Sequence, residues 1–401
     1  MRMSRLGALS ASAMRSARLR VGGWVARTAR SGTTYSISNV DIVKDSSGYV
    51  YTLNSSGYLN KFDSSGALVW TIGLVGWTYN GFSFLKIDGS NDLIVAYSNK
   101  IAKINSSGSI VWNKSLTIVN TIKDCAIDGS NDIYILSFDG SYNYVTKLVS
   151  AGTSITLFVR TPITAANIQY FKILVYGSNL YLLEFTRITK ISTAGTFVWN
   201  YDFTYGGTTP VFKNFGIDNS GSIIISMRYY PSASAAGGLI KLSDSGSTAS
   251  ITWQKYVYSS TYYIPSAYVT FDASNYIYVG DGDYLAKFNS SGVFSFENKF
   301  TVGTQGSGSV IINSAGNKIY FGGRVLSKVP TNGTGYGTYG FTSPTESATY
   351  SSINSSGFTF ASSSLGFSSS TLTFTSVTSP VISSGGITLT SNSLTNQVVN
   401  F

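Results

Sequence analysis

The stretch IAKINSSGSIVWNKSL, residues 101–116, combines a lysine strand, a Ser-Gly turn and a second strand that reaches a tryptophan. Close copies are LNKFDSSGALVW at residues 59–70 and ITKISTAGTFVW at residues 188–199. Self-similarity at a regular period is the sequence sign of a repeat architecture. The chain is therefore best interpreted as an array of units before any single residue is considered.

Alignment on the lysine identifies seven copies of the unit. The aligned residues are Lys61, Lys103, Lys147, Lys190, Lys241, Lys287 and Lys328. They are 42, 44, 43, 51, 46 and 41 residues apart. A period in the forties is typical of propeller blades.

Each unit predicts four short strands. An apolar stretch ends at an Asp or Asn turn, a second apolar strand follows, and then come the lysine strand and a strand tipped by an aromatic residue. Such strands, bounded by Gly, Ser, Asn and Asp, are typical of a blade. The aromatic tips are expected to pack between blades; they are Trp70, Trp112, Trp199, Trp253 and Phe296. We therefore predict an all-β chain whose residues 35–340 form a seven-bladed β-propeller.

The units resemble those of the PQQ-like and NHL-like β-propellers, whose repeats share this order of lysine strand, Ser-Gly turn and aromatic-tipped strand. The resemblance implies the fold and no particular activity, because propellers host unrelated functions. The sequence matches no quinone or catalytic-metal pocket of the cofactor-binding members, so we predict no cofactor and no metal. The last unit has a poor fourth strand, GTGYGTYG at residues 333–340, so the segment TTYSISNV at residues 33–40 is expected to close the ring.

Residues 1–34 are predicted to be a basic anchoring arm. The first 30 residues contain no acid and seven arginines, which supply most of the formal net charge of +10: Arg2, Arg5, Arg15, Arg18, Arg20, Arg27 and Arg30. Such a segment can grip an acidic surface. The pattern also fits an organellar transit peptide, and a disordered tail is a further alternative.

Residues 341–401 are predicted to be a small β-rich extension. Glu346 is their only charged residue, and Ser or Thr alternates with apolar residues in SGFTFASS, STLTFTSVT and GGITLTSN. Alternation with a period of two indicates strands. These strands could form a small module or lie along a neighbouring subunit.

Several catalytic classes are excluded by composition. Histidine is absent and Cys125 is the only cysteine, so a Ser-His-Asp triad, a His-ligated zinc or haem and an intrachain disulfide cannot form. Cys125 is expected to be a small buried hydrophobic residue. Since no catalytic motif was found either, we predict that the chain is not an enzyme.

Two repeated polar features have a structural and a functional interpretation. A ring of seven lysines could attract an anionic ligand, but a lysine stem packed between blades with its head in water is the interpretation we favour. The DGSND turns at residues 88–92 and 128–132, and the pair Asp281 and Asp283, resemble the start of a calcium loop. We favour turn formation, because the downstream acidic ligand is missing and Asp closes turns through its own backbone.

The fifth unit carries the longest connections, where repeat proteins usually bind partners. Tyrosines gather there, and they are the candidate interaction surface: Tyr229, Tyr230, Tyr258, Tyr262 and Tyr263. We predict no specific nucleic-acid partner, and no stretch is long and apolar enough to span a membrane.

The low charge, 11%, and the abundance of Ser, Gly, Tyr and Asn resemble virion proteins of tailed bacteriophages, especially tail and fibre proteins. The resemblance implies a structural, adhesive protein in a multi-copy assembly, located in the virion. Its arm and extension would bind other virion proteins, and the propeller would meet a host-surface glycan or protein. The alternatives are a secreted or surface-displayed propeller that binds glycan or protein, and a propeller lyase or hydrolase using Tyr, Lys or carboxylates in the central channel.

Overall fold

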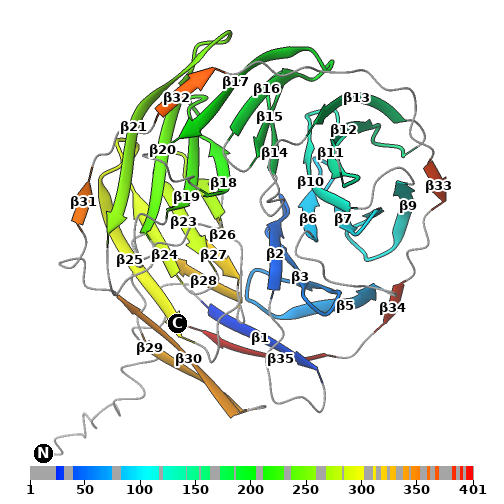
Figure 1. The fold of residues 1–401 in the computed structure, drawn as a ribbon. Coiled ribbons are helices and arrows are strands. Elements are labelled where there is room, and N and C mark those ends of the chain that lie inside the picture. The colour runs from blue at the N-terminus through cyan, green and yellow to red at the C-terminus, as the bar shows by residue number, and fades with distance from the viewer. Residues whose placement is uncertain are drawn as a thin grey trace, which may run out of the picture.

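The protein is an all-β propeller, seen in a computed structural model (Figure 1). The structure describes residues 24–30, 39–74, 83–116, 121–140, 142–152, 155–162, 172–184, 187–204, 211–229, 236–258, 268–281, 284–301, 310–312, 318–322, 326–330, 337–342, 345–352, 359–361, 366–369, 382–384, 389–391 and 394–400. The described part of the chain contains no helix long and apolar enough to cross a membrane.

Six blades are each built from four consecutive antiparallel strands. Blade 1 comprises β2 (Asn39–Lys44), β3 (Val50–Asn54), β4 (Tyr58–Phe62) and β5 (Leu68–Leu74), and blade 2 comprises β6 (Phe84–Ile87), β7 (Leu93–Tyr97), β8 (Lys100–Ile104) and β9 (Ile110–Leu116). Blade 3 comprises β10 (Thr121–Ile127), β11 (Ile133–Phe138), β12 (Tyr142–Leu148) and β13 (Ile155–Pro162), and blade 4 comprises β14 (Lys172–Tyr176), β15 (Asn179–Glu184), β16 (Arg187–Ser192) and β17 (Phe197–Thr204). Blade 5 comprises β18 (Val211–Ile217), β19 (Ile223–Tyr229), β20 (Ala236–Asp244) and β21 (Ala249–Tyr258), and blade 6 comprises β22 (Tyr268–Phe271), β23 (Ile277–Asp281), β24 (Tyr284–Phe288) and β25 (Phe294–Thr301).

The prediction of a seven-bladed propeller is wrong, because the structure has six blades and the seventh repeat does not form a blade by itself. It contributes three strands, β26 (Val310–Ile312), β27 (Lys318–Gly322) and β28 (Leu326–Pro330). The outer position beside β28 is taken by β1 (Trp24–Arg30), from the segment predicted to be the arm. The ring is therefore closed by a strand upstream of the expected TTYSISNV segment, whose last two residues begin β2.

The first strand of each sheet lines the centre of the ring and lies against the first strand of the next sheet, with β26 returning to β2. The second strands β3, β7 and β11 are buried along their whole length. Each described hydrophobic cluster joins two neighbouring blades, as Tyr51 and Leu53 of blade 1 do with Leu93 and Val95 of blade 2. Because burial of one such side chain contributes about 1.5–3 kcal/mol, stacking the blades supplies the stability that no single blade has.

The C-terminal extension forms a belt around the outside of the propeller (Figure 1). A hairpin of β29 (Gly337–Thr342) and β30 (Thr345–Ser352) adds to blade 6 through β30 and β25. The chain then adds β31 (Thr359–Ala361) to blade 5, β32 (Gly366–Ser369) to blade 4, β33 (Ile382–Ser384) to blade 2, β34 (Leu389–Ser391) to blade 1 and β35 (Leu394–Asn400) to β1. The strands thus lie along the chain's own blades, in reverse blade order. The segment STLTFTSVT lies outside the described residues.

The disc has two different faces. Because the strands of a blade alternate in direction, the turns after the first and third strands lie on one face, here called the turn face. The connections after the second and fourth strands lie on the other, here called the loop face. Trp24, the first residue of β1, pairs with Asn400, the last residue of β35, so the start of β1 and the end of β35 lie at the turn face.

Candidate functional site: the inter-blade contacts and the channel charges

In several blades the repeated lysine lies opposite a tryptophan in the strand register. Lys61 lies opposite Trp70, Lys103 opposite Trp112, and Lys190 opposite Trp199. The register shifts directly after each of these lysines, so one extra residue precedes the tryptophan. A β-bulge of this kind re-aims the following side chain, which explains why the sequence repeats the spacing of lysine, turn and tryptophan so closely.

The tryptophan reaches the next blade. The indole Nε1 of Trp112 donates to the backbone carbonyl of Ser150 at 3.1 Å, and that of Trp253 donates to Ser290 at 3.2 Å. The ring of Trp112 packs so closely on Gly152 that a Cβ there would lie 2.9 Å from it. The expectation that these aromatics pack between blades is confirmed for Trp112 and Trp253.

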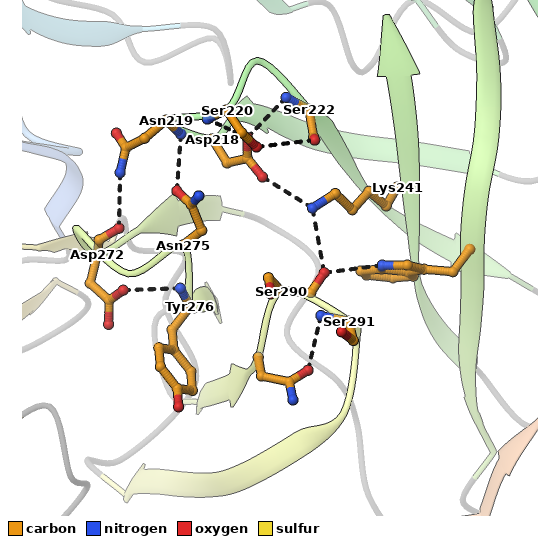
Figure 2. Close-up of polar contacts among 12 residues, drawn as sticks. Asp218, Asn219, Ser220, Ser222, Lys241, Asp272, Asn275, Tyr276, Ser290 and Ser291 are labelled. Atoms are coloured by element: carbon orange, nitrogen blue, oxygen red, sulfur yellow. Dashed lines mark hydrogen bonds and ion pairs between the residues drawn. The ribbon is translucent and has the colours of Figure 1, made fainter.

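Like the tryptophans, Lys61 and Lys241 donate to the turn between the third and fourth strands of the next blade. Lys61 donates to the carbonyl of Ser106 in blade 2 at 2.9 Å. Lys241 contacts Asp218 in its own blade at 3.1 Å and the carbonyl of Ser290 in blade 6 at 3.4 Å, as Figure 2 shows. One side chain therefore joins two blades.

Lys190 makes the most enclosed of these contacts. Its Nζ lies 2.8 Å from Asp244 Oδ2 in the next blade and 2.9 Å from the carbonyl of Gly246. The hydroxyl of Tyr181 donates to the same carboxylate oxygen at 2.6 Å. Burial alone would raise the pKa of Asp244, but the hydrogen bonds from Lys190 and Tyr181 hold it below its usual value. The carboxylate is thus stabilised in its charged form.

The expectation that the lysine heads lie in water is wrong for Lys61, Lys103 and Lys190, which are buried. Lys103 forms ion pairs with Asp88 at 2.7 Å and Asp92 at 3.3 Å. Burial lowers the pKa of Lys103, but the hydrogen bond and charge of Asp88 outweigh this effect and raise it. These contacts favour a structural role over an anion-binding ring.

The DGSND turns are closed by their own aspartates. Asp88 Oδ1 accepts hydrogen bonds from the backbone N–H groups of Ser90 and Asp92, both at 2.9 Å, and Asp128 does the same in blade 3. This confirms the turn interpretation. Asp283 lies outside the described residues, and among the described residues no group of three or more acids or cysteines is placed to hold a metal ion.

An asparagine links these turns from blade to blade. Asn131, with a φ of 64°, accepts a hydrogen bond from the N–H of Gly89 at 2.8 Å, and its amide donates to Ser90 at 3.1 Å. Asn275 accepts in the same way from Asn219 in blade 5 at 3.0 Å (Figure 2). Asparagine tolerates the left-handed conformation that this position requires, so the fourth turn residue is also an inter-blade contact.

A second polar cluster lies on the inner strands. Asp124 of β10 is buried and lies 3.2 Å from Lys86 of β6 and 3.9 Å from Lys172 of β14. Asp124 also accepts a hydrogen bond from the backbone N–H of Ile173 at 3.2 Å, and Asp41 accepts one from Leu85 at 2.9 Å. These carboxylates therefore join the inner strands of neighbouring blades.

Titratable groups near this cluster have shifted pKa values. Burial lowers the pKa of Lys123 to about 8, and Lys123 is the extra residue where the register of β10 shifts beside Asp124. Burial raises the pKa of Cys125, and the thiol is only 1% exposed. Cys125 is the buried hydrophobic residue that the sequence indicated.

The predicted tyrosine surface is only partly described. Tyr229 ends β19 and pairs with Ala236, and Tyr258 ends β21 and pairs with Thr359 of the belt. Both strands run toward the loop face, so the two backbones reach the same side of the disc. Tyr230, Tyr262 and Tyr263 lie outside the described residues.

Comparisons with known proteins show the fold. No family model matches the chain and no curated protein is similar to it. A catalytically inactive histidine-to-alanine variant of virginiamycin B lyase from Staphylococcus aureus, solved with quinupristin, is similar over 77% of this chain and 99% of its own, with a TM-score of 0.55 and 13% identity. The WD40 β-propeller domain of Doa1 covers 77% of this chain and 97% of its own, with a TM-score of 0.54 and 11% identity. The Pan2 WD40 domain of Neurospora crassa covers 77% and 95%, with a TM-score of 0.52 and 7% identity.

Proposed function

We propose that this chain is a structural binding protein without enzymatic activity, a rigid disc that presents its loop face to a partner. The observation that carries the proposal is the belt. It pairs with the outer strands of five blades and with the closing strand β1. Without it, these strand edges would be unpaired and open to water or to other chains. The belt, the inter-blade turn contacts and the carboxylates on the inner strands all join neighbouring blades, so the fold can present a rigid binding surface.

The setting that we propose is the virion of a tailed bacteriophage, as a tail or fibre component. The low charge and the Ser, Gly, Tyr and Asn content support it. The start of β1 and the end of β35 lie at the turn face. An anchoring arm before β1 would therefore leave the disc at that face, and the loop face would stay available for a partner. Because many copies would be held in one particle, their individually weak contacts would together give a high avidity for the host surface. Among the β-propellers, the repeated order of lysine strand, Ser-Gly turn and aromatic-tipped strand favours the PQQ-like or NHL-like class.

Native sedimentation tests this proposal. Extract of the source culture is separated on a velocity gradient, and the chain is followed by mass spectrometry. The proposal expects the chain in fractions far heavier than its own 43.0 kDa, together with other structural proteins. Recovery only as a free single chain in the culture medium would overturn the virion setting and favour a secreted binder of glycan or protein.

A channel enzyme is the second candidate. The cluster of Lys86, Asp124 and Lys172, with Lys123 nearby, is the observation that favours it. One similar structure is a lyase whose variant without one histidine is inactive, whereas this chain has no histidine at all. A lyase or hydrolase activity here would have to use lysine, tyrosine or carboxylate groups. Loss of a measured activity in Lys123→Met, with the fold intact, would establish it.

A further inference from the structure

Among the described residues, the closing strand β1 pairs with the belt at more positions than with the blade that it completes. In the strand register, β1 pairs with β28 at three positions, Trp24 to Ala26. It pairs with β35 at seven positions, from Trp24 with Asn400 to Arg30 with Leu394. Arg27, Thr28, Ala29 and Arg30 therefore pair only with the belt within the described strands.

This balance is reversed in the other blades. The pairing between the third and fourth strands covers five positions in blade 1 and eight in blade 5. The described residues of the belt strands on those two blades, β34 and β31, each pair at three positions. Elsewhere the blade holds its outer strand and the belt is an addition, whereas at the ring closure the belt provides most of the pairing.

The residue types follow the same division. At the turn-face end, apolar residues are Cα partners, with Val25 opposite Val399 and Ala26 opposite Val398. Cross-strand pairs of this kind stabilise a sheet. The other end pairs Arg27 with Gln397 and Thr28 with Asn396, which are polar. β35 is also tied, through the preceding belt strands, to blades 1, 2, 4, 5 and 6.

We propose that β35 is a latch that keeps the propeller ring closed. When β35 is displaced, the three pairs to β28 do not hold β1, and the ring opens at the seventh sheet. The N-terminal residues that precede β1 are then released together with it. The latch thus couples the two terminal segments, so that a load on the arm acts on the belt.

Trypsin reports on the latch directly, because Arg27 and Arg30 lie inside β1. The full chain is digested under native conditions, and cleavage after each residue is timed by mass spectrometry. The test variant is Asn396→Pro, which removes one N–H from β35 and disfavours its strand pairing. The matched control is Thr390→Pro in β34, which pairs with Gly73 of blade 1.

We expect Asn396→Pro to speed cleavage after Arg27 and Arg30 by about tenfold or more, since proteolysis follows the population of the open form. Thr390→Pro should leave these rates within about twofold of the unchanged chain. Cleavage after the buried Lys103 monitors general unfolding and should stay slow in both variants. Equal rates in all three proteins, or equal acceleration in both variants, would overturn the latch.

A second measurement covers the case in which Asn396→Pro does not fold. The double variant Ala26→Cys with Val398→Cys places two cysteines at paired positions, and the buried Cys125 is kept out of the reaction. When the disulfide is formed, cleavage after Arg27 should slow several-fold relative to the same protein after reduction. No difference between the oxidised and reduced forms would contradict the latch.

Discussion

Trp24 lies opposite Lys328 in the register of the seventh sheet. The same pairing joins Lys61 to Trp70 in blade 1 and Lys103 to Trp112 in blade 2. The N-terminal strand therefore supplies the tryptophan position that the last repeat lacks. One repeat unit is therefore divided between β1 and the strands of the last repeat.

Replacement of a described tryptophan should destabilise the fold strongly. Trp112→Ala removes a buried ring and its hydrogen bond to Ser150, so we expect a loss of about 3–5 kcal/mol in the free energy of unfolding. The control is Val111→Ala, because Val111 is the neighbouring bulge residue and is 52% exposed. Its effect should stay within about 0.5 kcal/mol. Urea denaturation of both variants provides the measurement.

The glycine beneath that ring should be equally intolerant of change. Gly152 has a φ of 69°, and an added Cβ would meet the Trp112 ring at 2.9 Å. Strain and overpacking together predict a loss of about 2–4 kcal/mol for Gly152→Ala. Gly48 has a φ of 93° with open space around it, so Gly48→Ala shows the cost of the backbone alone. Thermal denaturation of the two variants should separate them, and identical melting temperatures would contradict the contact with Trp112.

Acid should weaken the link between blades 4 and 5. Hydrogen bonds from Lys190 and Tyr181 hold the pKa of Asp244 below its ordinary value of 3.8. A carboxyl with a lowered pKa in the folded state stabilises the fold above the unfolded value and loses this contribution as the pH falls through the folded value. In Asp244→Asn, this loss of stability below pH 3.8 should be smaller than in the unchanged chain.

At pH 7 the same variant should lose about 3–5 kcal/mol, because Lys190 is left buried without its carboxylate. Urea midpoints measured between pH 7 and pH 2 test both parts of the prediction. Asp63→Asn is a suitable comparison, since Asp63 lies in an exposed turn and contacts Ser65 and Ala67 of that same turn. An acid dependence unchanged by Asp244→Asn would show that other carboxyl groups govern it.

Lys123 should be a source of instability at neutral pH. Burial lowers its pKa from 10.5 to about 8, so folding is hindered by the charged form below pH 8, and this penalty fades as the pH rises toward 10.5. Lys123→Met should therefore stabilise the fold by about 1 kcal/mol or more at pH 7. The gain should shrink between pH 8 and pH 10. A loss of stability at pH 7 would show that the ammonium group is well compensated.

The repeat was the part of the fold that sequence could predict. The lysine and tryptophan spacing indicated blades because each residue serves a local turn and bulge, and these are encoded within about a dozen residues. β1 was not predicted, although WVARTAR begins with the tryptophan that the last unit lacks, because its arginines indicated a basic anchoring arm. The signal was present, but the charge pattern was given more weight.

The course of the extension could not be predicted in the same way. Alternation in GGITLTSN indicated a strand, and β34 lies within it. Its partner strand β5 is more than 300 residues away, and period-two alternation carries no information about which edge a strand joins. Likewise, contacts such as that of Lys190 with Asp244 depend on the rotation between blades. The ammonium groups of Lys61 and Lys190 were therefore expected in water, although they contact the next blade.

The pairing of Trp24 with Asn400 also determines when the ring can close during synthesis of the chain. A ribosome that adds about 5–20 residues per second needs tens of seconds to make the chain between these two positions. Blades 1 to 6 can assemble in order during this interval, because β1 is made before all of them and its partner β35 after all of them. The nascent protein thus carries an incompletely paired strand until β35 has been made, and its circle is completed only then.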